Sequence, residues 1–242
     1  MKYRKTRLTL SGRLSTKTIA FISVFAAFHT TLYLISPPIL WRNWAIYLAP
    51  IEGIVLGPWA GFSSALIGST IGRIIVPTPL WMFGIFSEPL SVMVAAFLVR
   101  GAWKKVLAIQ VVFFGAYFAC SMGRSLPFWP LMDAVIAACL VFPAAKLSKN
   151  IFDEKAYLLP ASLAIVSFIT VATDGLARVF LLIPAGLYTI LGMTPAMVLA
   201  AFIGGGIDSF IEDTLVVVVS LFVGVPIVLT LRKLLSINKP LS

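Results

Sequence analysis

Apolar segments of membrane-spanning length make up most of this chain, and they limit the folds that it can adopt. Of its 242 residues, 60% are hydrophobic and only 12% are charged. A helix needs about 20 apolar residues to cross the hydrocarbon core of a bilayer, and the apolar runs here are of that order. They do not alternate polar and apolar residues as the strands of a transmembrane barrel would. The sequence therefore predicts an all-α polytopic membrane protein.

Basic residues gather at the chain ends and at alternate connections between the apolar segments. The four clusters are Lys2, Arg4, Lys5, Arg7, Arg13 and Lys17; Arg100, Lys104 and Lys105; Lys146, Lys149 and Lys155; and Arg232, Lys233 and Lys239. A bias towards Lys and Arg marks cytoplasmic connections. We therefore expect a multi-pass protein of the cell membrane with both termini in the cytoplasm. Because topology accounts for the net charge of +10, the charge does not point to nucleic acid.

The same pattern divides the chain into three regions. They are a basic N-terminus over 1–15, six spans over 16–149, and an extension of about two spans over 150–242. Within the extension, the stretch from Gly186 to Gly206 is apolar but broken by Pro195 and by a run of three glycines. A full crossing there would place the basic C-terminus outside. We therefore expect a re-entrant or surface segment there, and eight spans in all.

Residues 44–76 hold a tight turn between two apolar segments, Gly57-Pro58-Trp59-Ala60-Gly61. Proline suits the first position of a helix, where its missing N–H costs nothing, and glycine before it supplies the freedom to reverse direction. After the turn, small residues recur at helical spacing: Gly61, Ala65, Gly68 and Gly72. In lipid, such a face lets another helix approach closely. The span before the turn is short, so either it begins nearer Ile39 or the preceding loop enters the membrane.

An apolar segment, a Gly-Pro-x-Ala-Gly turn and a small-residue helix, in that order, resemble the second and third helices of the substrate-binding (S) components of energy-coupling factor (ECF) vitamin transporters. The resemblance extends from about Ile19 to Lys149, and so implies a six-helix core. It implies a membrane subunit that captures a vitamin-like small molecule from outside, in partnership with a T component and two ATPase subunits. The sequence has no phosphate-binding loop of the Gly-x-x-x-x-Gly-Lys-Ser/Thr type, so ATP hydrolysis would fall to separate subunits.

Ionisable residues away from the basic clusters provide the candidate chemistry. They comprise four arginines and seven carboxylates: Arg42, Arg73, Arg124, Arg178, Glu52, Glu88, Asp133, Asp174, Asp208, Glu212 and Asp213. Charged groups inside a bilayer face protein or a water-filled cavity and pair with one another. The set therefore indicates either the wall of an outward-facing cavity or structural ion pairs between helices, such as one between Asp174 and Arg178 at i, i+4 spacing.

The tetrapeptide Trp41-Arg42-Asn43-Trp44 combines two rings, a cation and an amide. It suits a ligand with an aromatic ring and an anionic group, although an aromatic belt at the membrane interface would also explain the tryptophans. In S components the substrate lies near the outer surface. The resemblance therefore implies a set of substrate-binding residues: Trp41, Arg42, Asn43, Trp44, Glu52, Trp81, Glu88, Arg124 and His29. A lone histidine in the outer part of a span, such as His29, is also typical of a hydrogen bond between helices.

Small residues on the first span suggest a docking face. In S components, small residues, typically Ala-x-x-x-Ala, contact the T component. The corresponding residues here are Ala20, Ser23 and Ala27, flanked by Thr16 and Thr31. The spacing Ser23-x-x-x-Ala27 departs from that pattern by one residue, and the two extra spans are a larger departure.

Two other functions stay open. One is a self-sufficient secondary transporter, proton-coupled through Glu52, Glu88 or Asp208. The other is an intramembrane enzyme. We expect no enzyme, cofactor or metal site, because the chain has one histidine and two cysteines in apolar segments. We interpret the carboxylates of Asp208-x-x-x-Glu212-Asp213 as a polar helix face.

Overall fold

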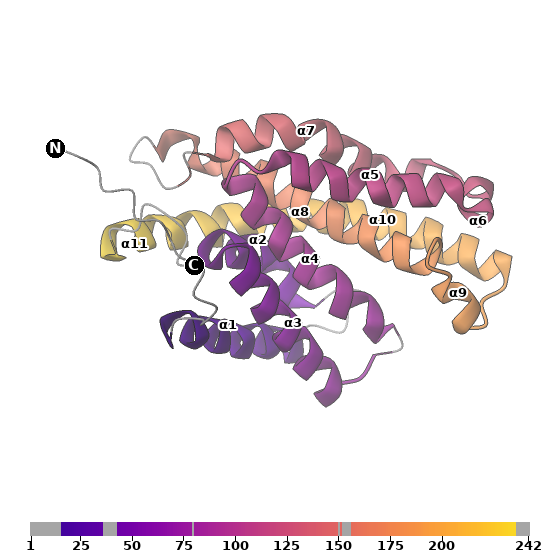
Figure 1. Ribbon diagram of the computed structural model, residues 1–242, viewed down its shortest axis with the longest axis horizontal. Helices are drawn as coiled ribbons and strands as arrows, with labels where there is room; N and C mark the ends of the chain where they lie inside the picture. The colour runs from indigo at the N-terminus through magenta and orange to yellow at the C-terminus, as the bar shows by residue number, and fades with distance from the viewer. Residues whose placement is uncertain (1–15, 36–42, 79, 150, 152–155, 236–242) are drawn as a thin grey trace.

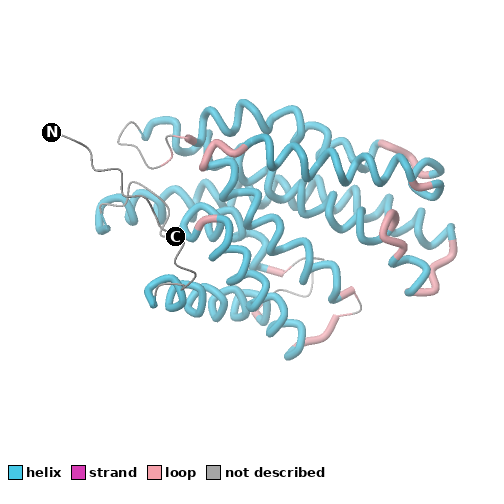
Figure 2. The backbone as a smooth tube through the Cα atoms, in the orientation of Figure 1, coloured by secondary structure: helices cyan, strands magenta, loops and turns pink. Residues whose placement is uncertain are grey.

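The computed structural model describes residues 16–35, 43–78, 80–149, 151 and 156–235, and every regular element within them is a helix (Figures 1 and 2). The α-helices are α1 (Thr16–Leu34), α2 (Trp44–Leu56), α3 (Pro58–Ile75), α4 (Trp81–Val99), α5 (Trp103–Ala119), α6 (Ser121–Ser125), α7 (Met132–Ser148), α8 (Leu159–Leu182), α9 (Leu187–Ile190), α10 (Pro195–Val219) and α11 (Val225–Leu235). Short 3-10 turns form η1 (Trp129–Leu131) and η2 (Ala156–Leu158), and η3 (Ser220–Gly224) is a π-helical turn.

The helices are those of a polytopic membrane protein, as the composition predicts. Within the described residues, five helical segments are long and apolar enough to cross a membrane: Thr16–Leu34, Trp81–Val99, Trp129–Ser148, Leu159–Leu182 and Pro195–Leu231. Large apolar side chains such as Phe222 and Ile74 remain exposed on the outside of the bundle. Since lipid is the solvent for such a surface, the exposure is expected of membrane helices.

The turn at Gly57-Pro58 forms as predicted. Gly57 has a φ of 84°, which favours glycine, and Pro58 begins α3. Before it, α2 is only 13 residues long because it begins at Trp44, where the side chain of Asn43 caps it by accepting from the N–H of Ala45. The helix therefore does not begin nearer Ile39, and its N-cap is buried.

The small face of α3 brings three helices together, as predicted. A Cβ atom on Gly61 would lie 2.7 Å from Val92 of α4, and one on Gly68 would lie 2.7 Å from the Cβ of His29 of α1. One on Gly72 would lie 2.6 Å from the ring of Tyr33. Real Cβ atoms do not approach other atoms this closely, so α1 and α4 can pack on α3 only because these residues lack side chains.

The expected separation of a six-helix core from a C-terminal extension does not describe the packing. Helix α8, from the extension, packs against α4, α5, α7 and α10. Its residues Leu163, Val166 and Ile169 are buried in one apolar cluster with Leu98 of α4 and Ala144 of α7. The reason is that α8 presents apolar residues to neighbours on several sides. The extension is therefore part of the same core.

The segment from Gly186 to Gly206 differs from the expected re-entrant or surface segment. A short connection with α9 ends at Thr194, whose side chain caps α10, and residues 195–206 are the regular first turns of that helix. Gly206 faces Pro130, and a Cβ atom at this position would overlap it. The three glycines therefore do not break α10, and one of them permits its close contact with η1.

Helices α10 and α11 form one long rod interrupted by η3. Pro226 has no N–H to donate to the carbonyl of Phe222, which explains the local change to π-helical bonding. In Figure 1, α1 begins and α11 ends at one end of the molecule, whereas α6 and α9 lie at the other end. The bundle thus has two distinct ends.

Candidate functional site

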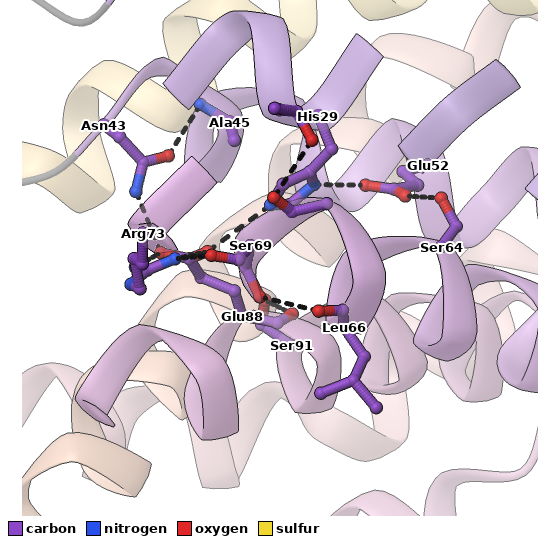
Figure 3. A network of polar contacts seen from close by, with 12 residues as sticks. His29, Asn43, Ala45, Glu52, Ser64, Leu66, Ser69, Arg73, Glu88 and Ser91 are labelled. Carbon is purple, nitrogen blue, oxygen red and sulfur yellow. Dashed lines mark hydrogen bonds and ion pairs between the residues drawn. The ribbon is translucent and has the colours of Figure 1, made fainter. Parts of the chain in front are cut away.

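Glu88 of α4 is the centre of a buried polar network (Figure 3). Arg73 of α3 donates to both of its carboxylate oxygens, with Nη2–Oε1 and Nη1–Oε2 distances of 2.5 and 3.1 Å. Asn43 donates its amide Nδ2 to Oε1 at 2.9 Å. Nη2 of Arg178 on α8 lies 3.6 Å from the same oxygen. One carboxylate therefore joins α3, α4, α8 and the start of α2.

His29 extends the network to a second carboxylate. Its Nε2 lies 3.4 Å from Oε2 of Glu88, and its Nδ1 lies 3.0 Å from Oε2 of Glu52 on α2. Ser64 of α3 donates to the other oxygen of Glu52 at 2.5 Å. Ionised carboxylates only accept hydrogen bonds, whereas an imidazolium donates from both nitrogens. An imidazolium between two carboxylates therefore satisfies both contacts.

Local sequence features create the space for these contacts. Gly84 lies one turn before Glu88 on α4, and a Cβ atom there would overlap the guanidinium of Arg73. Gly68 likewise accommodates His29. Two glycines on neighbouring helices therefore allow two bulky side chains, those of Arg73 and His29, to reach the same glutamate.

The extension supplies the other part of the network. Nε of Arg178 donates to Oδ2 of Asp174, one turn earlier on α8, at 2.7 Å. Charges removed from water need close partners, because desolvation otherwise outweighs their attraction. The pair therefore offsets the cost of placing Asp174, which has no exposed surface, inside the bundle.

A cavity of about 890 Å³ lies beside the network, towards the end of the bundle that carries α6 and α9. Arg73, Arg178 and Asn43 line it from the network side, whereas Asp133, Asp208 and Glu212 line it from α7 and α10. Most of the remaining wall is apolar, and includes Tyr33, Phe83, Leu176, Met193 and Phe202. Such a volume accommodates a small organic molecule.

A second cavity of about 320 Å³ lies between α1, α2 and α11. Its wall is almost entirely apolar, and His29 and Glu52 are its only ionisable lining residues within the described part of the chain. Arg73 lines the first cavity and His29 the second, with Glu88 in contact with both side chains. The polar network therefore lies between the two cavities.

The structure brings together four of the predicted site residues: Asn43, Glu52, Glu88 and His29. The other three described residues of the predicted site, Trp44, Trp81 and Arg124, lie at more exposed positions. The side chains of Trp44 and Trp81 are 38% and 46% exposed, and Arg124 is exposed on α6. None of these three lines the large cavity. The exposure of the two tryptophans fits the interfacial belt that was the alternative.

Other predicted residues lie elsewhere. Trp41 and Arg42 are outside the described residues. Ala20, Ser23 and Ala27 lie on the exposed face of α1, together with Thr16 and Thr31. We expected Asp208 and Glu212 to form only a polar helix face. Both residues instead line the large cavity.

The predicted substrate-binding residues did not include Arg73, Arg178 or Ser64, although both arginines belonged to the ionisable set that indicated a cavity wall or structural ion pairs. A signal existed for the arginines, because each interrupts an apolar helix and such residues need a buried partner. For Ser64 there was none, since serine is common among the small residues of membrane helices. Among the described residues, no group of three or more His, Cys, Asp or Glu side chains is arranged to hold a metal ion.

Comparisons with known proteins add one relative. No known protein family matches the chain, and no solved structure matches it. Over 132 residues the chain is 28% identical to the uncharacterized protein MJ0923 of Methanocaldococcus jannaschii, an alignment that covers 53% of this chain. The chain matches 44% of the length of that relative.

Proposed function

We propose that this chain is a membrane transport protein that captures a vitamin-like small molecule in the 890 Å³ cavity. It acts as the substrate-binding subunit of an ECF-type importer, with a separate T component and two ATPase subunits. The observation that carries the proposal is the cavity itself, which places two arginines and three carboxylates on an otherwise apolar wall between membrane helices. Ionisable residues within membrane helices usually face the bundle interior or a water-filled cavity, and they mark the pathways of substrates or ions.

The proposed orientation places the cavity on the outer side. The connection between α4 and α5 carries Arg100, the first turn of α5 carries Lys104 and Lys105, and the end of α7 carries Lys146. These helix ends lie with the start of α1 and the end of α11 in Figure 1, opposite α6 and α9. The positive-inside rule assigns the first of these ends to the cytoplasm, so the cavity near the other end would receive substrate from outside.

The exposed small face of α1 supports partner docking. Ala20, Ser23 and Ala27 cover no other described helix. Small side chains let a second helix approach closely, and close contact is the main source of helix association in lipid. A helix of the T component could therefore dock on this face while the cavity stays accessible.

The test is Ala27→Trp, with Val111→Trp on α5 as the matched control. Both positions are exposed, and only the first lies on the small face of α1. The compound that co-purifies with the wild-type protein, identified by mass spectrometry, serves as the labelled substrate. We expect Ala27→Trp to abolish ATP-driven uptake by cells carrying all subunits and to leave binding by the purified chain within twofold of wild type. Val111→Trp should leave both unchanged.

Two results would contradict the proposal. Equal uptake by Ala27→Trp and Val111→Trp would show that this face of α1 does not dock. Wild-type uptake in cells that lack every ATPase partner would refute the importer itself.

His29 favours a second candidate, the self-sufficient proton-coupled transporter. Its ring bridges Glu52 and Glu88, and the bridge lies between the two cavities. Protonation and deprotonation of a ring held between two carboxylates would change the charge of the whole network. Such a device can couple proton movement to the exposure of a substrate site.

Reconstitution of the chain alone distinguishes the two candidates. In liposomes without ATPase subunits, the second candidate predicts uptake of the co-purifying compound driven by a pH gradient, and its loss in His29→Gln. Conversion of Lys104, which is exposed at the start of α5, to Gln is the control. If a pH gradient drives no uptake by the wild-type chain, this candidate is excluded.

A further inference from the structure

The helix bundle holds more negative than positive side chains. Apart from the basic clusters, the described residues include seven carboxylates and three arginines, which are Arg73, Arg124 and Arg178. Arg124 is exposed on α6 and does not line the large cavity. Even with His29 counted as positive, Arg73 and Arg178 leave an excess of carboxylates among the described residues. A cation would offset this formal excess of negative charge, which is costly to hold within a membrane.

Asp208 is one of the carboxylates that line the large cavity. It projects from the middle of α10, a helix that crosses the membrane, and lines the cavity with Glu212 one turn later. No hydrogen bond or ion pair joins its carboxylate to another residue within the described ranges. Gly204 and Gly205 also line the cavity, and a Cβ atom on either would meet open space. The two glycines therefore leave open space beside the carboxylate.

The two arginines that line the same cavity already have partners. The terminal nitrogens of Arg73 bind Glu88 and the carbonyl of Ser69, and Nε of Arg178 binds Asp174. An anionic ligand would therefore compete with contacts that hold the bundle together, whereas a cation at Asp208 would not.

The residues that line the cavity indicate which class of cation it would bind. No carboxylates within the described residues gather in a group able to hold a metal ion. The cavity is large, and Tyr33, Phe83 and Phe202 give it aromatic walls. An aromatic surface attracts both apolar bodies and organic cations. These properties fit a charged amine on an aromatic or apolar body better than an inorganic ion.

We propose that the large cavity binds an organic cation: an amine on an aromatic body, with its positive charge at Asp208. The inference rests on the proposed transport function and deepens it by naming the substrate class. It also places the charge-recognising residue on α10, outside the six helices that resemble an S component. The ligand charge is opposite to the one that Arg42 and its neighbouring tryptophans favoured from sequence.

Three indoles of matched shape test the sign of the ligand charge. Tryptamine is positive, tryptophol is neutral and indole-3-propionate is negative at neutral pH. Their binding to the purified full chain is measured by titration and by the shift in thermal unfolding temperature. A charge-assisted hydrogen bond in a buried site corresponds to about tenfold or more in affinity. We therefore expect tryptamine to bind about tenfold or more tightly than tryptophol, and indole-3-propionate to bind most weakly.

Two variants assign the preference to Asp208. Asp208→Asn should remove the advantage of tryptamine over tryptophol, whereas Asp208→Glu, which keeps the charge, should retain most of it. Thermal unfolding without ligand shows whether each variant is folded, and the comparison of the three indoles on the wild-type chain needs no variant. Equal affinity for the three indoles, preference for the anion, no binding at millimolar concentration, or an unchanged preference in Asp208→Asn would each overturn the proposal.

The outcomes also separate this inference from the proposed function. A preference for tryptamine that depends on Asp208, in a chain whose uptake needs no ATPase subunits, would keep the cation site and refute the importer. ATPase-dependent uptake together with preference for the anion would keep the importer and refute the cation site.

Discussion

Arg73 and Glu88 form a two-point ion pair between α3 and α4, inside the bundle and beside the large cavity, with Nη2–Oε1 and Nη1–Oε2 distances of 2.5 and 3.1 Å. The fork of a guanidinium matches the two oxygens of a carboxylate, so the pair fixes orientation as well as distance. His29, Asn43 and Arg178 reach the same carboxylate. The cavity wall is therefore held by groups whose positions depend on one another.

Removing one member of this pair should destabilise the fold strongly. Arg73→Met leaves Glu88 with less compensation in the interior, and loss of one partner of a buried pair costs about 3–5 kcal/mol. We expect the double variant Arg73→Met/Glu88→Met to cost less than the sum of the two single variants. Unfolding in mixed detergent micelles measures these differences. Arg124→Met, at an exposed arginine, is the control and should change stability by no more than about 0.5 kcal/mol.

A methyl group at Gly84 should disturb the same pair without removing a charge. In Gly84→Ala the new atom would occupy the position of the Arg73 guanidinium, and we expect a loss of about 1–3 kcal/mol from overpacking. The matched control is Gly115→Ala on α5, where a Cβ atom meets open space and alanine favours the helix by up to about 1 kcal/mol. Equal effects of the two substitutions on unfolding would contradict the placement of Arg73 against α4.

Asn43 should matter more than an ordinary helix cap. Its Oδ1 accepts from the N–H of Ala45, and its Nδ2 donates to Glu88. Thr194 provides the comparison, because its side chain caps α10 by accepting from Met197 and makes no ion-pair contact. Thr194→Ala should cost about 1 kcal/mol, and Asn43→Ala should cost about 1–3 kcal/mol more, since a hydrogen bond to a charged group is lost as well. Similar losses in unfolding free energy would show that the bond to Glu88 contributes little.

Cysteine labelling of intact cells tests the orientation. In a background with Cys120 and Cys139 replaced by serine, a membrane-impermeant maleimide should label Ile190→Cys, which is exposed on α9 at the end of the bundle that the proposed orientation places outside. Lys104→Cys, exposed at the start of α5, should label only after permeabilisation, because the basic cluster around it favours the cytoplasm. The reverse pattern would invert the protein in the membrane and turn the large cavity towards the cytoplasm.

The amino-acid sequence by itself determined the features that depend on nearby residues. Apolar runs of membrane-spanning length predicted the helices, and Gly57-Pro58 predicted the turn between α2 and α3. The glycines of α3 predicted a face for close packing. These signals are local because helix formation, turn geometry and the helical period involve residues within one or two turns of each other.

Only the tertiary structure decided which helices and which charges meet. The helical period shows which residues share a face but not which helix packs on that face, so the central place of α8 could not be read from its pattern. For the same reason, Glu88 had many possible partners, and the structure selected Arg73, Asn43, His29 and Arg178 from four different parts of the chain. Desolvation makes such pairing obligatory, but the order in which the helices pack determines which pairs form.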